Sequence, residues 1–232
     1  MIPKVIHKII LVDGNKTPPF PEGLEGAIES FRKLNPEYTV KLYNGVDCLK
    51  YITRHYDQDT LRTFLTLKPY AFRCDFMRHL ILHVEGGWYS DMRQVCLHPL
   101  EALNATGKDY YASVDCPPNQ TCMYNAFIGA VPGHPITKKM IDLITWNVAQ
   151  RHYGIDCLYI TGPGAFMNAC IDHVRENPTK CMIGLHTSDE FIQFGDTKVI
   201  KCKYNNARGA DNSDIQGGND YGDLWRKRDV YY

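Results

Sequence analysis

The sequence predicts an α/β protein with a mixed, mainly parallel central sheet flanked by helices. Short runs rich in β-branched or aromatic residues alternate along the chain with longer runs whose apolar residues recur at helical spacing. Such alternation is typical of sheets covered by helices. The chain has 232 residues and 44% hydrophobic content, enough to bury one sizeable core, so we expect a single domain spanning residues 1–232.

The N-terminal elements are predicted in the order strand, helix, strand. Residues 2–12 are mostly apolar and β-branched, and a glycine- and proline-rich segment follows them, which predicts a buried first strand. Apolar residues at helical spacing predict a helix over 22–34, which an Asn-Pro pair ends. Residues 38–43 then alternate in the manner of a second strand.

The central part of the chain is predicted to hold a long helix over residues 70–85. Its apolar residues fall on one face, and Gly86 and Gly87 supply a glycine C-cap. Further predicted elements are strands over 88–90, 110–114 and 126–131, a helix over 134–150 with Pro135 in its first turn, and a helix over 165–174.

The C-terminal segment differs in composition from the rest of the chain. After Asp196 it becomes polar and rich in glycine and asparagine, and it then returns to aromatic residues at Tyr221 and Trp225. This pattern predicts a mobile surface loop with an aromatic anchor near its end.

Charge and composition exclude several classes of protein. Lys plus Arg and Asp plus Glu each number 26, so no net charge would draw the chain to nucleic acid. No apolar run approaches the roughly 20 residues of a membrane span. The nine cysteines and the histidines show no zinc-binding spacing, so we expect reduced thiols and, for most histidines including His186, structural roles. The expected location is cytoplasmic, with peripheral membrane attachment left open.

Charged residues cluster in the helix and strand around the Gly-Gly pair. Asp75 and Arg78 lie three apart, hence on one face of the predicted helix, and Asp91 follows the next strand. Open α/β sheets bind ligands at that edge. Carboxylates accept hydrogen bonds from sugar hydroxyls, and guanidinium groups match phosphate oxygens. The alternative is an ordinary surface ion pair, with Asp91 capping a turn.

The clearest resemblance to a known family lies in residues 71–91, AFRCDFMRHLILHVEGGWYSD. This run resembles the signature of the glycosyltransferases with a DxD sugar-binding region, family 32. Further similarity lies in residues 2–7 (IPKVIH), 35–38 (NPEY), 125–135 (NAFIGAVPGHP) and 161–163 (TGP). The Leu224-Trp225 pair is similar to the end of the closing loop in the clostridial toxin glucosyltransferases.

The resemblance implies a GT-A-type nucleotide-sugar-binding domain that transfers a sugar with retention of anomeric configuration. Its partners would be a nucleoside-diphosphate sugar, with UDP favoured and GDP open, and a glycan, glycolipid or glycoprotein acceptor. Residues 203–232 would close over the donor site. The implied catalytic residues are Asp91, Arg78 and Trp225, the donor-binding residues Asp75, Arg73, Tyr89, Arg93, His7, Ile9 and Asn125, and the acceptor-side residues Thr161, Gly162 and Pro163.

One departure from the family pattern leaves the cofactor open. Arg93 stands where the family has its second DxD carboxylate, normally a ligand of Mn²⁺ or Mg²⁺. The leaving diphosphate needs positive charge, which either a divalent cation or Arg93 could supply. For a metal, the candidate ligands are Asp223, Asp220 and Asp91. The indole N–H of Trp225 could reach the leaving phosphate oxygen, or its ring could be only a hydrophobic anchor.

The same departure leaves a second function open. A protein that kept the fold but lost the second carboxylate could be a catalytically weakened nucleotide-sugar or glycan-binding protein. Slow hydrolysis of the donor would separate the two, because transferases commonly lose sugar to water and a pure binding protein would not.

Overall fold

A computed structural model describes residues 1–116, 121–205 and 215–232 of the chain. In these ranges it forms a single nine-stranded sheet with helices packed around it. The strands are β1 (Val5–Ile9), β2 (Thr39–Tyr43), β3 (Gly87–Ser90), β4 (Val95–Cys96), β5 (Tyr110–Val114), β6 (Met123–Ala130), β7 (Cys181–His186), β8 (Phe191–Phe194) and β9 (Thr197–Lys201).

The sheet is mixed, with strand order β2-β1-β3-β6-β5-β7-β8-β9-β4. Six strands run in one direction, and β4, β6 and β8 run in the opposite direction. Because β6 and β8 each lie between two strands of the other direction and β4 lies at the edge beside β9, only three of the eight neighbouring pairs are parallel. The predicted mixed sheet is therefore confirmed, whereas a mainly parallel pairing is wrong.

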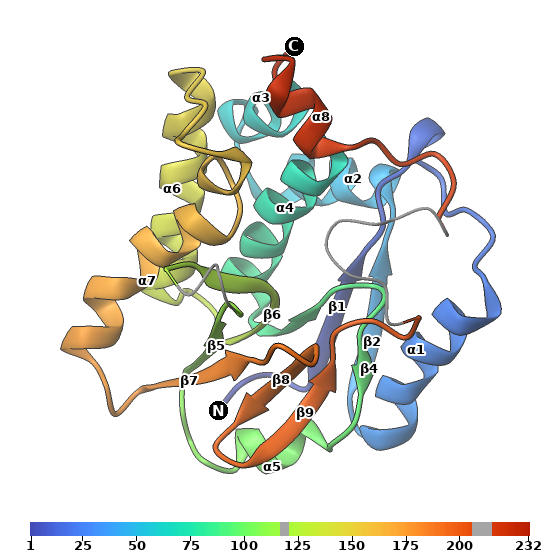
Figure 1. The fold of residues 1–232 in the computed structure, drawn as a ribbon, viewed down its shortest axis with the longest axis vertical. Coiled ribbons are helices and arrows are strands. Elements are labelled where there is room, and N and C mark those ends of the chain that lie inside the picture. Colours follow the sequence, from blue (N-terminus) through green and yellow to red (C-terminus); the bar gives the residue numbers. More distant parts are fainter. Residues whose placement is uncertain (117–120, 206–214) are drawn as a thin grey trace.

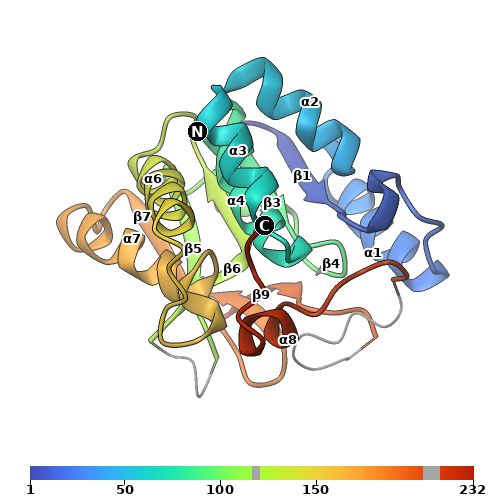
Figure 2. The same cartoon turned by 90° about the horizontal axis from the view of Figure 1, so that it is seen from above.

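Most helices lie on one side of the sheet, as Figures 1 and 2 show. α4 contacts β1, β3 and β6, and it packs beside α6, which in turn contacts α7. α1 lies apart from these helices, against β2 and β4. The helices are α1 (Glu22–Leu34), α2 (Gly45–His55), α3 (Gln58–Thr66), α4 (Tyr70–Glu85), α5 (Leu100–Asn104), α6 (Pro135–Ala149), α7 (Pro163–Glu176) and α8 (Tyr221–Arg226), with 3-10 turns η1 (Asp13–Asn15) and η2 (Cys157–Tyr159).

The two faces of the sheet are covered by two separate apolar clusters. Side chains alternate along a strand, so adjacent aromatic residues point to opposite faces. Tyr89 and Tyr110 pack with α2, α3, α4, α6 and α7, whereas Trp88 and Tyr111 pack with α1, α5 and the β8–β9 hairpin. Both faces of the central strands are thus buried, which explains their nearly continuous apolar sequence.

Local patterns predicted the elements around the glycine pair well. The structure has helices at Glu22–Leu34 and Tyr70–Glu85, as predicted, and the second ends at Gly86, whose φ of 64° suits glycine. One detail differs, because α4 is buried almost all round between the sheet and other helices rather than on a single apolar face. The sequence analysis did not identify α2, α3 or the strands β7 to β9.

The last residues of the chain are fixed to the connection between α3 and α4. Lys68 N–H donates to the Val230 carbonyl at 2.9 Å, and Tyr232 N–H donates to the Thr66 carbonyl at 2.9 Å. Figure 1 shows the C-terminus beside α3. The predicted mobile loop lies partly in 206–214, outside the described residues.

The cysteines and the apolar character of the helices were considered from composition. All nine cysteines are free thiols, as predicted. Among the described helices, none has the length and apolar character required to cross a bilayer.

Candidate active site

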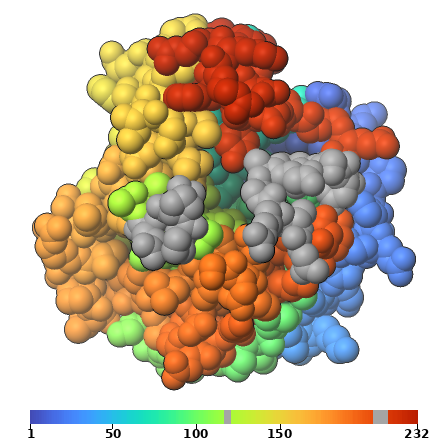
Figure 3. Space-filling model, viewed as in Figure 1, coloured from blue at the N-terminus to red at the C-terminus, as the bar shows by residue number. Residues whose placement is uncertain are grey.

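A cleft of ≈ 430 Å³ opens at one edge of the sheet. β1, β3, β5, β7 and β9 run in the same direction and end at this edge, and the opposed strands β6 and β8 begin there. Residues far apart in the sequence therefore meet around the cleft. Figure 3 shows this face of the molecule hollowed beside the C-terminal segment. Open α/β sheets bind ligands at the corresponding edge.

Asp75 and Arg78 form a buried ion pair on α4, with 2.9 Å between Oδ1 and Nη2. The Asn125 amide donates to Oδ1 of Asp75 at 2.9 Å, and the Thr161 hydroxyl donates to Oδ2 at 2.8 Å. Arg78 also donates to the Asn125 carbonyl. Burial raises the pKa of Asp75, and the charge of Arg78 opposes that rise. This network joins α4, β6 and the loop before α7, so the surface ion pair considered from the sequence is excluded.

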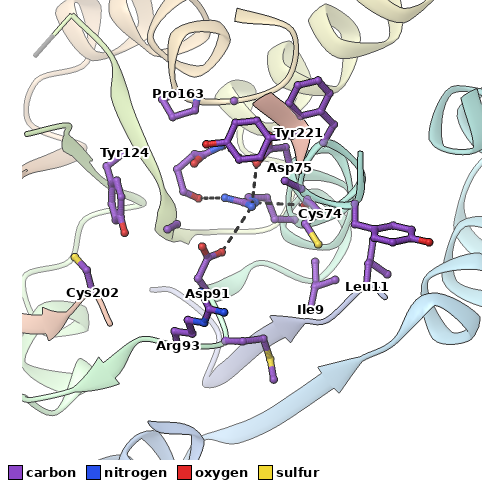
Figure 4. Close-up of a pocket in the computed structure, with 18 of the residues that line it drawn as sticks. Ile9, Leu11, Cys74, Asp75, Asp91, Arg93, Tyr124, Pro163, Cys202 and Tyr221 are labelled. Atoms are coloured by element: carbon purple, nitrogen blue, oxygen red, sulfur yellow. Dashed lines mark hydrogen bonds and ion pairs between the residues drawn. The ribbon is translucent and has the colours of Figure 1, made fainter. Parts of the chain in front are cut away.

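Asp91 presents the accessible carboxylate of this region, with 43% of its side chain exposed. The Tyr89 hydroxyl donates to its Oδ1 at 2.6 Å, and Nη2 of Arg78 lies 3.7 Å from the same oxygen. Burial holds the pKa of Tyr89 far above its usual range, so the phenol stays a donor. Figure 4 shows Asp91 pointing into the cleft near Arg93, with Asp75 deeper in the wall.

Lys8 holds the backbone at Asp91 in place from within the protein. It is fully buried on β1, and its Nζ donates to Ser90 Oγ and to the Asp91 carbonyl, each at 2.9 Å. The ammonium also lies 4.0 Å from the centroid of the Phe31 ring. Burial lowers the pKa of Lys8 to about 7. Sequence analysis missed this residue, although a lysine in the middle of the mostly apolar strand predicted over 2–12 was the available signal.

Several other predicted residues meet at the cleft. Arg93 is largely buried in the wall of the cleft. Thr161 is buried behind Asp75, to which its hydroxyl donates a hydrogen bond. A Cβ on Gly162 would come within 3.4 Å of the Asp75 carboxylate, so the loop approaches this network closely. The predicted residues that line the cleft are Ile9, Asp75, Arg78, Tyr89, Asp91, Arg93, Asn125, Gly162 and Pro163.

Two predicted donor-binding residues lie elsewhere. Arg73 points away from the cleft and donates to the Leu67 carbonyl, with its guanidinium 5.9 Å from the Tyr232 ring centroid. His7 is buried within β1, bonded to Tyr43 and to the Gly86 carbonyl, and burial lowers its pKa to about 4. Both therefore stabilise the fold, and the expectation that they contact the donor does not fit their positions.

The C-terminal residues predicted for catalysis and metal binding are also placed away from the cleft lining. The Trp225 indole donates to the Tyr153 carbonyl at 2.7 Å. Asp220 caps α8 by accepting from Asp223 N–H at 2.7 Å, and Asp223 pairs with Arg226. In this arrangement Trp225 is the hydrophobic anchor considered from the sequence. The α8 segment reaches the cleft through Gly218, Asn219 and Tyr221 instead.

These positions bear on the divalent cation that the family pattern implies. Asp91 is the carboxylate that this part of the wall offers to the cleft, and the basic residue Arg93 lies beside it. Asp220 and Asp223 are both occupied by other contacts. The residues therefore do not fit a cation shared between Asp91 and the α8 carboxylates.

The opposite wall of the cleft holds polar residues that sequence analysis did not select. Asp115 follows β5, His186 ends β7, Glu190 precedes β8 and Cys202 follows β9. Nδ1 of His186 lies 2.8 Å from Oδ1 of Asp115, and its ring lies 4.1 Å from that of Tyr124. In Figure 4, Tyr124 and Cys202 stand across the cleft from Asp91. The position of Asp115 directly after a predicted strand was a usable signal.

Comparison with known sequences shows which proteins this chain is similar to. Residues 21–112, which include α4, β3 and Asp91, match the family described as glycosyltransferase sugar-binding region containing DXD motif. An uncharacterized glycosyltransferase of Acanthamoeba polyphaga mimivirus is 26% identical over 180 residues, 77% of this chain and 68% of that protein. Inositol phosphoceramide mannosyltransferase 2 of Schizosaccharomyces pombe is 29% identical over 170 residues, 70% of this chain and 44% of that protein.

A third relative is similar over a comparable length. Initiation-specific alpha-1,6-mannosyltransferase of Candida albicans is 24% identical over 184 residues, 63% of this chain and 47% of that protein. The chain therefore spans less than half the length of these fungal relatives.

Two solved structures with a similar fold are glycosyltransferase domains of toxins. PaToxG glycosyltransferase superposes with a TM-score of 0.55 at 20% identity, covering 75% of this chain and 70% of that one. The ligand-free glycosyltransferase domain of the YGT toxin gives a TM-score of 0.56 at 7% identity, covering 78% and 80%. At such identities the likeness concerns the fold, which is a GT-A-like glycosyltransferase fold. The resemblance to the glycosyltransferases with a DxD sugar-binding region is confirmed.

Proposed function

We propose that this chain is a retaining glycosyltransferase that moves a sugar from a nucleoside-diphosphate sugar to a hydroxyl of a glycan or glycoconjugate. The observation that carries the proposal is the partly exposed Asp91 carboxylate, held by Tyr89 and Arg78 in the wall of the cleft. It lies in the segment that matches the DxD glycosyltransferase family. The general activity has the support of the sequence relatives, and the donor, acceptor and stereochemistry are our inferences.

Different residues of the cleft suit different parts of the donor. Asp91 can accept hydrogen bonds from ribose or sugar hydroxyls, because an ionised carboxylate is an acceptor only. Arg93 lines the cleft beside it and supplies positive charge where the diphosphate would lie. The apolar residues Ile9 and Leu11, at and beyond the end of β1, offer a surface for the base. UDP remains the favoured nucleotide, and the fungal relatives' names make mannose the first sugar to test.

The acceptor would approach from the side of Gly162 and Pro163, at the start of α7. Residues 203–232 would form the closing part of the donor site, since Gly218, Asn219 and Tyr221 line the cleft. Transfer with retention breaks the bond between the anomeric carbon and the diphosphate oxygen and forms a bond from that carbon to the acceptor oxygen on the same face of the sugar, and the acceptor hydroxyl's proton passes to the departing diphosphate. The chain's contribution to that step is to position the donor and to offset charge on the leaving diphosphate.

The alternative is a nucleotide-sugar-binding protein with weakened catalysis, which the basic Arg93 in place of the second carboxylate favours. One screen separates the two. Thermal shift and donor hydrolysis are measured across UDP- and GDP-sugars, each with Mn²⁺ and with EDTA. We expect a stabilising donor that is hydrolysed slowly. Binding without hydrolysis or transfer would support the alternative, and no binding to any nucleotide sugar would contradict both.

A single substitution tests the assignment of the site. Asp91→Asn keeps the shape of the side chain and removes its charge, so we expect transfer to fall at least about 100-fold, or about 2.7 kcal/mol in transition-state stabilisation. The melting temperature should change little, because Asp91 is partly exposed. Near-full transfer by the purified variant with the correct donor would refute the role of Asp91.

A further inference from the structure

The His186 ring has one nitrogen with a defined proton and one without a partner. A carboxylate can only accept, so Nδ1 must donate its hydrogen to Asp115 Oδ1, 2.8 Å away. In the neutral ring Nε2 then carries a bare lone pair. The side chain is only 5% exposed, and among the described residues Nε2 has no hydrogen-bond partner. An unpaired buried nitrogen costs free energy unless another group fills that position.

The group that faces Nε2 is another acceptor. Oε2 of Glu190 lies 3.5 Å from it, and a carboxylate and a bare imidazole nitrogen have no hydrogen to share. Sγ of Cys202 completes the set, with the three potential ligand atoms within 4.8 Å of one another. Three electron-pair donors around one point call for a cation between them.

We propose that His186, Glu190 and Cys202 bind a zinc-class divalent cation on the wall of the cleft opposite Asp91. Zn²⁺ accepts imidazole, thiolate and carboxylate ligands together, whereas Mg²⁺ prefers oxygen alone. Two ligands about 2.0–2.1 Å from a tetrahedral ion stand about 3.4 Å apart. The observed 3.5 Å between Nε2 and Oε2 matches that separation.

Charge and surroundings agree with this site. One thiolate and one carboxylate balance the two positive charges of Zn²⁺. Asp115 orients the imidazole through Nδ1, the arrangement by which a carboxylate commonly supports a zinc-bound histidine. All three ligands line the cleft, so a fourth coordination position can face it, as in catalytic rather than structural zinc sites. This site is independent of the proposed transfer reaction.

Glu190 has an unusual backbone conformation that keeps its side chain here. Its φ is 66° in the turn between β7 and β8, where glycine or asparagine would be favoured. The Cys202 N–H donates to the Glu190 carbonyl at 2.8 Å, so the two ligand-bearing residues are also joined through the backbone.

The simplest alternative is a proton on Nε2, giving an imidazolium between two carboxylates. A charge-assisted N–H···O bond is normally about 2.7–2.9 Å long, shorter than the 3.5 Å found here. Lys203 also lines the cleft, and its charge acts on Glu190. If a His186 imidazolium or the Lys203 ammonium supplies the positive charge between these groups, the protein will bind no metal at this site.

A second group of potential ligands, His134, His173 and Cys181, serves as an internal control. His134 Nδ1 accepts a hydrogen bond from Ile136 N–H at 3.2 Å. In the neutral ring Nε2 therefore carries the hydrogen and has no lone pair for a metal. The same reasoning that favours His186 thus excludes His134.

The experiment measures metal directly in the unaltered chain of 232 residues. Protein treated with a chelator is loaded with Zn²⁺, desalted, and analysed for bound metal, and a second sample is titrated with Co²⁺. We expect one equivalent of Zn²⁺ and, with Co²⁺, the thiolate-to-metal absorption band and visible bands of four-coordinate cobalt. Absence of stoichiometric zinc together with absence of the thiolate band would overturn the proposal without bearing on sugar transfer.

Variants locate the metal within the chain. Cys202→Ser should abolish the thiolate band, and Asp115→Asn should weaken zinc binding about 10- to 100-fold. Cys181→Ser is the matched control, a buried cysteine of the second group, and it should keep both zinc and the band. Circular dichroism checks that each variant is folded. Loss of metal in Cys181→Ser with retention in folded Cys202→Ser would refute the site.

Discussion

The two walls of the cleft differ in how completely their polar groups are paired. On the α4 side, Asp75 accepts from Arg78, Asn125 and Thr161. On the β5–β9 side, Nδ1 of His186 bonds to Asp115, and Nε2 has no hydrogen-bond partner among the described residues. Both walls are buried and carry charge. The Asp75 network on the α4 side has its hydrogen bonds within the protein, whereas the His186 ring on the β5–β9 side does not.

The difference separates groups that position from groups that bind. A buried carboxylate with all its bonds inside the protein has little left for a ligand, and its removal disturbs the fold. A buried nitrogen without a bond is costly to the fold and is available to a ligand. We therefore assign Asp75 to positioning, and we look for ligands at Asp91 and at His186.

The largest expected effect is the loss of stability when Asp75 is removed from the wall on the α4 side. Asp75→Ala leaves the Arg78 charge buried without its partner, which should reduce the free energy of unfolding by about 3–5 kcal/mol. Urea denaturation gives this value. The matched control is Asp59→Ala, which breaks an i,i+3 pair with Arg62 whose side chains are each 74% exposed. That change should cost about 0.5 kcal/mol or less, and equal losses in both variants would contradict the distinction.

Arg78→Lys tests whether the guanidinium geometry matters within that wall. Arg78 donates in several directions at once, to Asp75 and to the Asn125 carbonyl. A lysine ammonium cannot reproduce this fork, so we expect a loss of about 2–3 kcal/mol and transfer almost as low as in Arg78→Ala. Denaturation and initial rates measure the two effects. A lysine variant close to the original in both would show that only charge is needed.

Lys8 should give the protein a specific pH dependence. Its pKa is about 7 in the fold and near 10.5 when unfolded, so between these values the unfolded chain binds more protons. Stability from this residue therefore rises with pH through that window, by about 2 kcal/mol between pH 7 and 9. Lys8→Met should remove this rise, measured as the difference between the two proteins in urea denaturation. Parallel curves for both would mean that Lys8 does not titrate there.

The smallest effect is expected at Trp225. Trp225→Phe keeps the ring packing and loses one hydrogen bond to the Tyr153 carbonyl, a change of about 1 kcal/mol in stability. Transfer should stay within about twofold, because the indole is directed at Tyr153 rather than the cleft. A drop in transfer comparable to that of Asp91→Asn would restore the catalytic role implied by the family resemblance.

The parts of the site that sequence predicted are those set by local patterns. The helix over 70–85, its glycine stop and the strand end before Asp91 each follow from residues within a few positions of one another. Arg73 shows the limit. It lies on the same helix as Arg78, but since α4 is buried almost all round, the apolar pattern cannot tell which charged side chain faces the cleft.

The opposite wall depends on pairing between distant residues. Asp115 and His186 are brought together by β5 and β7, which are parallel neighbours although β6, α6, η2 and α7 lie between them in the sequence. The turn that holds Glu190 has no Gly or Asn at the position with positive φ, so the usual hairpin signal is absent. Strands of four to six residues there are too short to be told apart from loops by periodicity alone.

The C-terminal pairing with the α3–α4 connection has a consequence for the cleft. Lys68 N–H donates to the Val230 carbonyl and Tyr232 N–H donates to the Thr66 carbonyl, so these bonds hold the C-terminal side of α8. Asn219 and Tyr221, just before α8 and at its first residue, line the cleft. Deletion of the last three residues should therefore release α8 and weaken donor binding, although none of the deleted residues lines the cleft.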